Sequence, residues 1–313
     1  MNFQQLRIIR ETVKSNFNLT EAANALNTSQ SGVSKHIKDL EDELGIELFV
    51  RRGKRLLGLT EPGQELVGIV ERILLDTQNI KKLGEQFTNR DRGQLVVATT
   101  HTQARYTLPP VVTAFKKEFP KVNLSLHEAS PAEIVLMLSD GQADIGIATE
   151  ALQDNPDLAA FPYYAWHHGV IVPRGHALTG EKLLTLDKLA EWPIVTYQRG
   201  YTGRARIDAA FETAELIPNI VMSALDADVI KAYVELELGI GIIASMAFNP
   251  ERDPHLALLD ARHLFAGNTS RIAVRRGSYL RGYAYRFIEL CSSKLDEPAI
   301  RAGSAATGDG RDK

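Results

Sequence analysis

A run of polar side chains stands where a predicted helix begins near the N-terminus. Just before it, Ala22, Ala23 and Ala25 are small enough for two helices to cross closely, as in a helix-turn-helix. The polar residues that would reach DNA are Thr28, Ser29, Gln30, Ser31, Ser34 and Lys35. Glutamine can pair with adenine, serine can contact a base or a phosphate, and lysine can contact guanine or the backbone. The pattern predicts DNA recognition but not the operator, and a three-helix packing module with solvated charges is the structural alternative.

The net charge of -3 gives no global argument for nucleic-acid binding, so the case depends on local charge. Residues 48–60 contain no acid, while Arg51, Arg52, Lys54 and Arg55 cluster in a predicted hairpin. We expect this hairpin to be a wing, in which Arg51, Arg52 and Lys54 contact phosphate or the minor groove.

A second polar group lies at predicted strand ends and helix starts. Thr100, Thr102 and Gln103 stand where a strand ends and a helix begins, Thr149 ends another strand, and Thr202 precedes a later helix. Neutral side-chain donors and the unpaired backbone N–H groups of a helix start can hold an anion without a matching positive charge. The residues predict a cleft for a small anion, with helix capping alone as the alternative.

The remaining motifs do not support catalysis, a cofactor or a metal. Residues 239–244 match a dinucleotide fingerprint in letters, but a predicted helix rather than a strand precedes them. His167 and His168 are adjacent and would point to opposite faces of a strand, which suits neither chelation nor a catalytic dyad. Cys291 is the single cysteine and can form no internal disulfide. We therefore expect no enzymatic activity, no cofactor and no metal.

Two segments come before the predicted anion site in the chain, a DNA-binding domain and a long helix. Residues 1–59 have the pattern of an all-α winged helix-turn-helix domain, with a short hairpin as the wing. In residues 60–90, Thr60 caps a long helix whose apolar side chains recur at steps of three and four. This helix would be about 40 Å long, which is more than a compact domain needs, so we interpret it as a dimerisation linker. An amphipathic helix packed on its own domain is the alternative.

Residues 91–300 alternate predicted strands and helices, which indicates an α/β fold. We expect two lobes, one from about 91–163 and 266–300 and the other from about 164–265. Residues 301–313 are rich in Gly and Ala and are expected to be disordered. No signal peptide and no run of about 18 apolar residues is found, so we expect a cytoplasmic protein without a membrane partner.

Several segments together resemble the LysR-type transcriptional regulators. In the N-terminal part they are residues 3–6, 18–26, 28–34, 40–45, 49, 51–54 and 59–63. Residues 98–106, 147–152, 201–204 and 226–231 resemble the branch of this family that activates the cysteine regulon. The resemblance covers nearly the whole chain. It implies a two-lobed, periplasmic-binding-protein-like effector domain, with the five polar residues of the predicted cleft as effector ligands and Trp166 near them.

The resemblance also implies the partners and the signal. They are double-stranded promoter DNA of sulfur-assimilation and cysteine-biosynthesis genes, RNA polymerase, and further copies of the chain in a homodimer or homotetramer. The inducer would be N-acetylserine or O-acetylserine, with sulfate or thiosulfate species as modulators. One alternative is a paralogue that controls sulfonate or sulfate-ester use and senses sulfate or adenosine phosphosulfate. Another is an enzyme or solute-binding protein with an accessory DNA module, against which the missing catalytic motif and export signal weigh.

Overall fold

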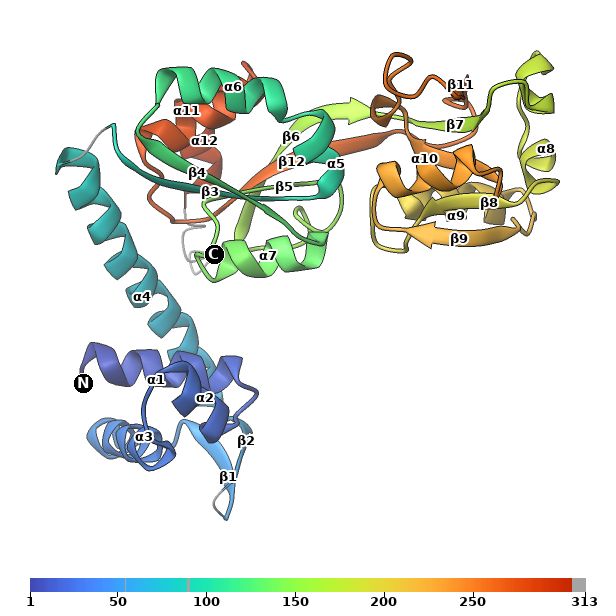
Figure 1. The fold of residues 1–313 in the computed structure, drawn as a ribbon. Helices are drawn as coiled ribbons and strands as arrows, with labels where there is room; N and C mark the ends of the chain where they lie inside the picture. Colours follow the sequence, from blue (N-terminus) through green and yellow to red (C-terminus); the bar gives the residue numbers. More distant parts are fainter. Residues whose placement is uncertain (54, 89–90, 306–313) are drawn as a thin grey trace, which may run out of the picture. The chain divides into compact units, whose positions relative to one another are not determined.

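The computed structural model describes residues 1–53, 55–88 and 91–305 of the 313-residue chain. It divides into two compact units, Met1–Glu85 and Gln86–Lys313 (Figure 1). Lys54, one of the predicted DNA-contacting residues, lies outside the described residues. Within the described part of the chain, none of the helices has both the length and the apolar character needed to cross a membrane.

The N-terminal unit begins with three helices and a hairpin. They are α1 (Phe3–Lys14), α2 (Leu19–Ala25), α3 (Gln30–Leu44), β1 (Phe49–Arg52) and β2 (Arg55–Leu59). Asn2, Asn18 and Ser29 each stand before a helix and accept a hydrogen bond from its first-turn backbone, which fixes where the three helices start. Gly45 ends α3 in the left-handed conformation with φ 68°, which glycine adopts at low cost. Local chemistry therefore sets the helix boundaries of this unit.

One apolar stripe on α3 builds the core of the N-terminal unit. Val33, Ile37 and Leu40 recur at helical spacing and are at most 1% exposed. They pack with residues of α1 and α2 and with Phe49 of the hairpin. Because this stripe faces the core, the opposite side of α3 is left to solvent. The polar residues of its first turns are thus carried on a firmly packed helix.

The helix α4 (Glu61–Thr88) follows the hairpin. Its start is capped by Thr60, whose hydroxyl accepts a backbone hydrogen bond of 3.1 Å. Val70 and Leu74 are buried in a cluster with residues of α1 and α4. Further along, Ile80 and Phe87 are each 69% exposed. The helix is therefore packed on its own unit near its start and carries exposed apolar side chains nearer its end.

The first sheet of the C-terminal unit has five strands in the order β4-β3-β5-β12-β6. The strands are β3 (Gly93–Thr99), β4 (Val122–Glu128), β5 (Ile145–Ala148), β6 (Leu158–Trp166) and β12 (Asn268–Arg275). Strand β3 runs parallel to β4 and β5, and β12 runs antiparallel to β5 and β6. The helices are α5 (His101–Tyr106), α6 (Pro109–Glu118), α7 (Pro131–Ser139), α11 (Gly282–Cys291) and α12 (Glu297–Ser304). Figure 1 shows α6 and α11 on one face of this sheet and α7 on the other.

The second sheet has five strands in the order β11-β7-β10-β8-β9. The strands are β7 (His168–Pro173), β8 (Ile194–Tyr197), β9 (Ile220–Ala224), β10 (Ile240–Ala244) and β11 (Leu256–Asp260). Its helices are α8 (Leu186–Ala190), α9 (Arg204–Thr213) and α10 (Ala227–Glu235), with short 3-10 helices at Ala177–Gly180 and Ser245–Ala247. The chain passes to this sheet after β6 and returns before β12, so the two-lobed α/β fold is confirmed (Figure 1).

Two predicted boundaries differ from the structure. The predicted change of lobe at 163/164 falls inside β6, because this strand stays paired with β12 as far as Trp166. The predicted disordered tail at 301–313 begins instead with the last turn of α12, which runs to Ser304. Arg276 Nη1 donates to the carbonyl of Gly303 at 2.6 Å, and Ser304 is buried. Tertiary contacts thus hold residues 301–304, while residues 306–313 lie outside the described residues.

Candidate functional site

The polar residues predicted to face DNA lie together at the start of α3. Five of them are exposed and Ser34 is half-buried; the exposed ones are Thr28, Ser29, Gln30, Ser31 and Lys35. Ser29 also serves the helix, because its hydroxyl accepts from the backbone of Gly32 at 3.1 Å and lies 3.2 Å from the hydroxyl of Ser31. The first turns of α3 thus present an accessible surface of amide, hydroxyl and ammonium groups, the types that read base edges and phosphates.

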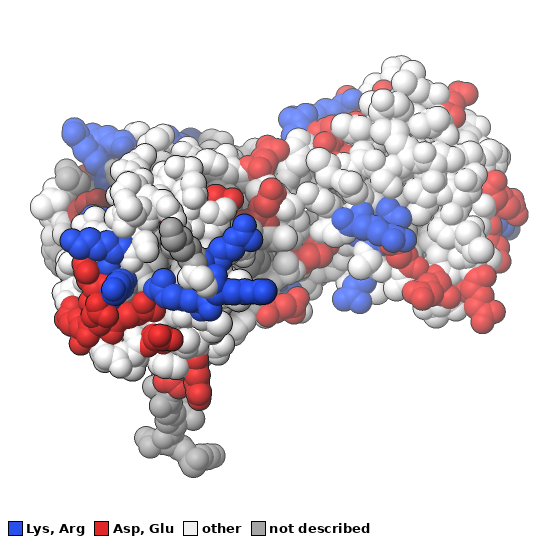
Figure 2. Space-filling model, turned by 90° about the horizontal axis from the view of Figure 1, so that it is seen from below, with Lys and Arg blue, Asp and Glu red and all other residues white. Residues whose placement is uncertain are grey.

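The hairpin is joined to α3 by a buried carboxylate, that of Glu41, which no sequence motif indicates. Glu41 Oε1 accepts from the backbone N–H of Leu48 at 2.9 Å and of Phe49 at 3.3 Å, and its Oε2 pairs with Arg51 Nη2 at 2.6 Å. Arg51 therefore helps to position the wing through Glu41, and both Arg51 and Arg52 are exposed. Figure 2 shows Lys and Arg side chains gathered on one face of the N-terminal unit, with acidic side chains next to them. The basic side chains predicted for this surface therefore form a local patch, and acidic side chains border it.

Two of the predicted cleft residues meet across the lobes. Thr102, on α5 of the first lobe, places its Oγ1 3.4 Å from Oγ1 of Thr202, which precedes α9 in the second lobe. Both side chains are buried, at 1% and 4% exposed. Thr202 has φ 44° and is followed by Gly203 with φ 70°, so a left-handed turn brings its hydroxyl to this place. The contact joins two segments that the sequence separates by 100 residues.

Three further predicted residues converge on Ser270 of β12. Its fully buried hydroxyl lies 3.0 Å from Gln103 Nε2, 3.1 Å from Trp166 Nε1 and 3.2 Å from Thr149 Oγ1. Ser270 is absent from the predicted site, since a serine in an alternating strand carries no motif. The structure thus places Gln103, Thr149 and Trp166 together. Thr100, the remaining predicted residue, is buried before α5 and its hydroxyl makes no cap hydrogen bond to that helix.

A buried histidine supports the Thr202 turn. His168 Nε2 lies 3.1 Å from the carbonyl of Thr202, and its Nδ1 lies 3.4 Å from Nδ2 of Asn268. Burial lowers the pKa of His168 to about 4, although the hydrogen bond to Thr202 opposes this shift. The ring is therefore neutral near pH 7, with Nε2–H donating to Thr202. His168 therefore holds the turn at Thr202 through its ring.

Glu150 brings a carboxyl group next to the predicted cleft residues. The backbone N–H of Gly203 donates to Oε1, while Oε2 is buried without a hydrogen-bond partner. Burial raises the pKa of Glu150 above its usual value, which the hydrogen bond from Gly203 partly opposes. Glu150 and Thr149 line a cavity of about 360 Å³, together with residues that include Arg206 and Arg271. A protonated Glu150 would donate to an anion in this region, whereas an ionised one would repel it.

A polar cluster joins the lobes beside these residues. Asp228 of α10 accepts from Tyr106 at 2.7 Å and from Nε of Arg105 at 3.3 Å, and its Oδ2 lies 3.3 Å from Nε2 of His101. Burial alone would raise the pKa of Asp228, but hydrogen bonds from Tyr106, Lys231 and His101 lower it to about 2. Burial would lower the pKa of His101, but its bonds to carboxylates raise it. Helix α5 is therefore fastened to the second lobe at neutral pH.

Comparison with known proteins places both units in one family. Residues 3–64 match the model of the bacterial regulatory helix-turn-helix protein, lysR family, and residues 88–296 match the LysR substrate binding domain. The HTH-type transcriptional regulator SsuR of Burkholderia cenocepacia is 56% identical over 96% of this chain and 97% of its own length. The regulator cbl of Escherichia coli (strain K12) is 54% identical over 96% and 95%, and CysB of Burkholderia cenocepacia 51% over 96% of both chains.

A solved structure agrees with these matches. The cofactor-binding domain of the Cbl transcriptional regulator aligns with a TM-score of 0.68 and 47% identity, over 70% of this chain and 96% of that domain. The relatives are transcriptional regulators and not enzymes. The winged helix-turn-helix at the N-terminus, the two-lobed C-terminal fold and the full-length identity agree with one another: the chain belongs to the LysR family of DNA-binding transcriptional regulators.

Proposed function

We propose that this regulator controls sulfur-assimilation and cysteine-biosynthesis genes and responds to a small anion held in the cleft between its lobes. The observation that carries the proposal is the convergence of hydroxyl and amide groups from both lobes, in which Thr102 lies 3.4 Å from Thr202 and Gln103 lies 3.0 Å from Ser270. Buried neutral donors of this kind suit sulfate, thiosulfate or the carboxylate of an acetylated serine. The relatives SsuR, cbl and CysB support the assignment to sulfur genes.

In this proposal the DNA is bound by the exposed start of α3 and by the wing. Gln30 contacts a base, Lys35 contacts guanine or the DNA backbone, and Arg52 contacts phosphate, since all three are exposed on the N-terminal unit. The same proposal assigns Thr28, Ser29, Ser31, Ser34, Arg51 and Lys54 to the interface. The chain acts in the cytoplasm, where promoter DNA is available.

Oligomerisation through α4 is part of the proposal. Ile80, Leu83 and Phe87 are exposed apolar side chains at helical spacing on this helix. Covering them with a second copy would remove apolar surface from water. A dimer, or a tetramer built from two dimers, would present two helix-turn-helix units to one promoter, and the bound regulator would contact RNA polymerase.

Titration of the full chain with candidate effectors tests the proposed signal. Calorimetry with N-acetylserine, O-acetylserine, sulfate, thiosulfate and adenosine phosphosulfate gives the affinity of each, and promoter binding is measured with and without the tightest. We expect at least one of these compounds to bind and to change promoter affinity or DNA bending. Binding of none of them, with promoter binding intact, would overturn the effector proposal while leaving the regulator assignment untouched.

A second candidate function is the paralogous control of sulfonate or sulfate-ester use. The identity of 56% with SsuR and 54% with cbl, against 51% with CysB, favours this candidate. In this case adenosine phosphosulfate or sulfate would bind more tightly than either acetylserine. Comparing promoter fragments of sulfonate-utilisation genes with fragments of cysteine-biosynthesis genes in the same binding assay separates the two candidates.

A further inference from the structure

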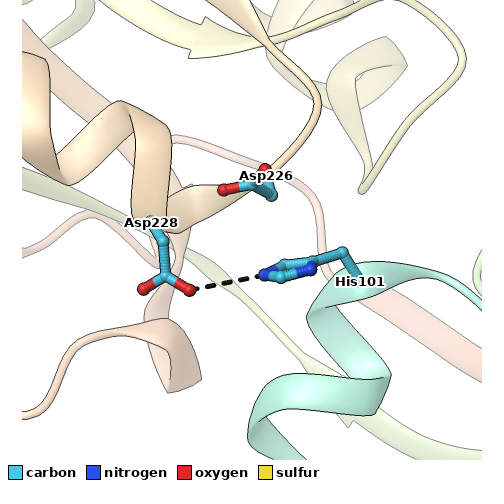
Figure 3. Close-up of side chains that lie close together, drawn as sticks. All are labelled: His101, Asp226 and Asp228. Carbon is cyan, nitrogen blue, oxygen red and sulfur yellow. Dashed lines mark hydrogen bonds and ion pairs between the residues drawn. The ribbon is translucent and has the colours of Figure 1, made fainter. Parts of the chain in front are cut away.

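His101, Asp226 and Asp228 form a cluster of metal-binding side chains where the two lobes meet. His101 begins α5 of the first lobe, and the two aspartates lie at the start of α10 in the second. One possible ligand atom from each residue lies within 4.8 Å of the others. Figure 3 shows the imidazole edge turned toward Asp228, with Asp226 next to both. All three residues are half-buried.

The imidazole of His101 is oriented from its other side by a carboxylate. Its Nδ1 lies 2.9 Å from Oε2 of Glu128 on β4, and its Nε2 lies 3.3 Å from Oδ2 of Asp228. In the protonated ring Nε2–H donates to Asp228; once the ring loses this proton, Nδ1–H still donates to Glu128 and the lone pair of Nε2 faces the two aspartates. Histidines that bind metals almost always donate their second ring N–H to a carboxylate or carbonyl, which fixes the ring and increases its basicity. Glu128 occupies that position.

Asp226 is held through one carboxylate oxygen, whereas both oxygens of Asp228 have protein partners. Asp226 caps α10 through Oδ1, which accepts from the backbone of Val229 at 2.9 Å. Oδ1 of Asp228 accepts from Tyr106 at 2.7 Å and pairs with Lys231 at 3.1 Å. Oδ2 of Asp228 faces His101 and also accepts from Nε of Arg105, whose half-exposed side chain can withdraw.

The charge of the surroundings favours a divalent cation. Four carboxylates stand in this cluster, and two basic side chains oppose them; the acids are Glu128, Asp226, Asp228 and Asp253, and the bases are Arg105 and Lys231. With a neutral His101, the cluster carries an excess of two negative charges. One imidazole nitrogen with two carboxylate oxygens is a ligand set that suits Zn²⁺ and its neighbours in the first transition row better than Mg²⁺ or Ca²⁺.

We propose that His101 Nε2 and one carboxylate oxygen each from Asp226 and Asp228 bind a divalent transition-metal ion of the Zn²⁺ class across the two lobes. Three protein ligands leave a fourth position for water. Metal–ligand distances of about 2.0–2.2 Å require the three atoms to approach one another by roughly 1 Å, a shift within reach of side chains at a helix start. This site departs from the metal-free expectation, because His101 and Asp228 are 127 residues apart in the chain.

The site would bear on effector binding, a consequence that rests on the proposed function. His101 directly precedes Thr102 on α5, so an ion that fastens His101 to α10 also holds Thr102 near Thr202. Two ligands that favour the same arrangement of the lobes increase each other's affinity. The metal proposal itself does not need an effector and is tested without one.

The experiment uses the full chain and two metal probes. Titration with Zn²⁺ by calorimetry and with Co²⁺ by visible absorption is carried out on the wild type, His101→Ala and Asp226→Asn. Asparagine still caps α10, so Asp226→Asn loses a charged ligand without losing the cap. We expect one Zn²⁺ per chain, a Co²⁺ spectrum of tetrahedral intensity, and at least tenfold weaker binding in both variants. Circular dichroism verifies that the variants are folded.

Two controls make the result decisive. His127→Ala removes an exposed histidine from the same strand as Glu128 and should leave Zn²⁺ affinity unchanged. Excess Mg²⁺ should not displace Co²⁺. The proposal is overturned if the wild type binds no Zn²⁺, or if His101→Ala and Asp226→Asn bind it as tightly as the wild type, since the metal would then occupy other surface groups.

Discussion

The hydroxyl oxygens of Thr102 and Thr202 lie 3.4 Å apart although the two threonines belong to different lobes of the C-terminal unit. Both side chains are buried, so each hydroxyl depends on its neighbours for hydrogen bonds. An anion bound between them would accept from both and would thereby favour a closed arrangement of the lobes. This contact gives the effector proposal its sharpest test.

Replacing Thr102 with valine should weaken effector binding and leave DNA binding unchanged. Valine keeps the branched shape but cannot donate a hydrogen bond, and the loss of one bond to a charged ligand costs about 1.5–3 kcal/mol, or about 10- to 100-fold in affinity. Calorimetry with the tightest anion measures the effect. Thr113→Val, on the exposed side of α6, is the control. Equal effector affinity in Thr102→Val and the wild type would count against the cleft site.

Removing the Ser270 hydroxyl should destabilise the C-terminal unit. In Ser270→Ala, the buried donors of Gln103 and Trp166 lose a shared acceptor, and each unsatisfied buried group costs about 1–3 kcal/mol. Urea unfolding followed by tryptophan fluorescence gives the change in free energy. The exposed Ser293→Ala should change it by less than about 0.5 kcal/mol. Similar unfolding of both variants would show that Ser270 does not organise this network.

Neutralising Lys35 or Arg52 should lower promoter affinity and its dependence on salt. Each phosphate contact that is lost reduces the slope of log affinity against log salt by about 0.9. Fluorescence anisotropy of a promoter fragment at several salt concentrations, with Lys35→Ala and Arg52→Ala, gives affinity and slope. Lys117→Ala removes the same charge from the exposed surface of α6 and should change neither. A control that behaves like Arg52→Ala would indicate a merely global effect of charge.

Acidification should destabilise the C-terminal unit through His168. Burial lowers the pKa of His168 to about 4, while the unfolded chain has the ordinary value of 6.5. Between these values the unfolded state binds the extra proton, so the contribution of His168 to stability is complete above pH 6.5 and is lost as the pH falls toward 4. The loss reaches about 3 kcal/mol at the lower end.

Chemical unfolding of the wild type and His168→Gln at several pH values measures this effect. Glutamine can still donate to the Thr202 carbonyl but does not titrate, so its free energy of unfolding should depend less on pH in this range. His127→Gln, at an exposed position, should follow the wild type. A His168→Gln variant whose stability falls as steeply as that of the wild type would show that other groups cause the acid sensitivity.

The sequence determined the local elements, and from it we predicted residues for the DNA-binding and effector-binding surfaces. Caps such as Ser29 and Gly45, and the stripe of Val33, Ile37 and Leu40, act within a few residues of chain. Local signals of this kind can be read without knowing which distant segment packs alongside. The same holds for Thr102 and its neighbours at the end of β3, and the family resemblance indicated what they would bind.

Only the tertiary structure decided which of these residues meet. Ser270 joins Gln103 and Trp166 because β12 returns to the first sheet between β5 and β6, and Asp228 reaches His101 because the lobes face each other there. The chain leaves the first lobe only after Trp166, because β6 stays paired with β12 up to that residue. Such contacts arise from pairing between segments far apart in the chain, on which helical periodicity, caps and turn residues carry no information.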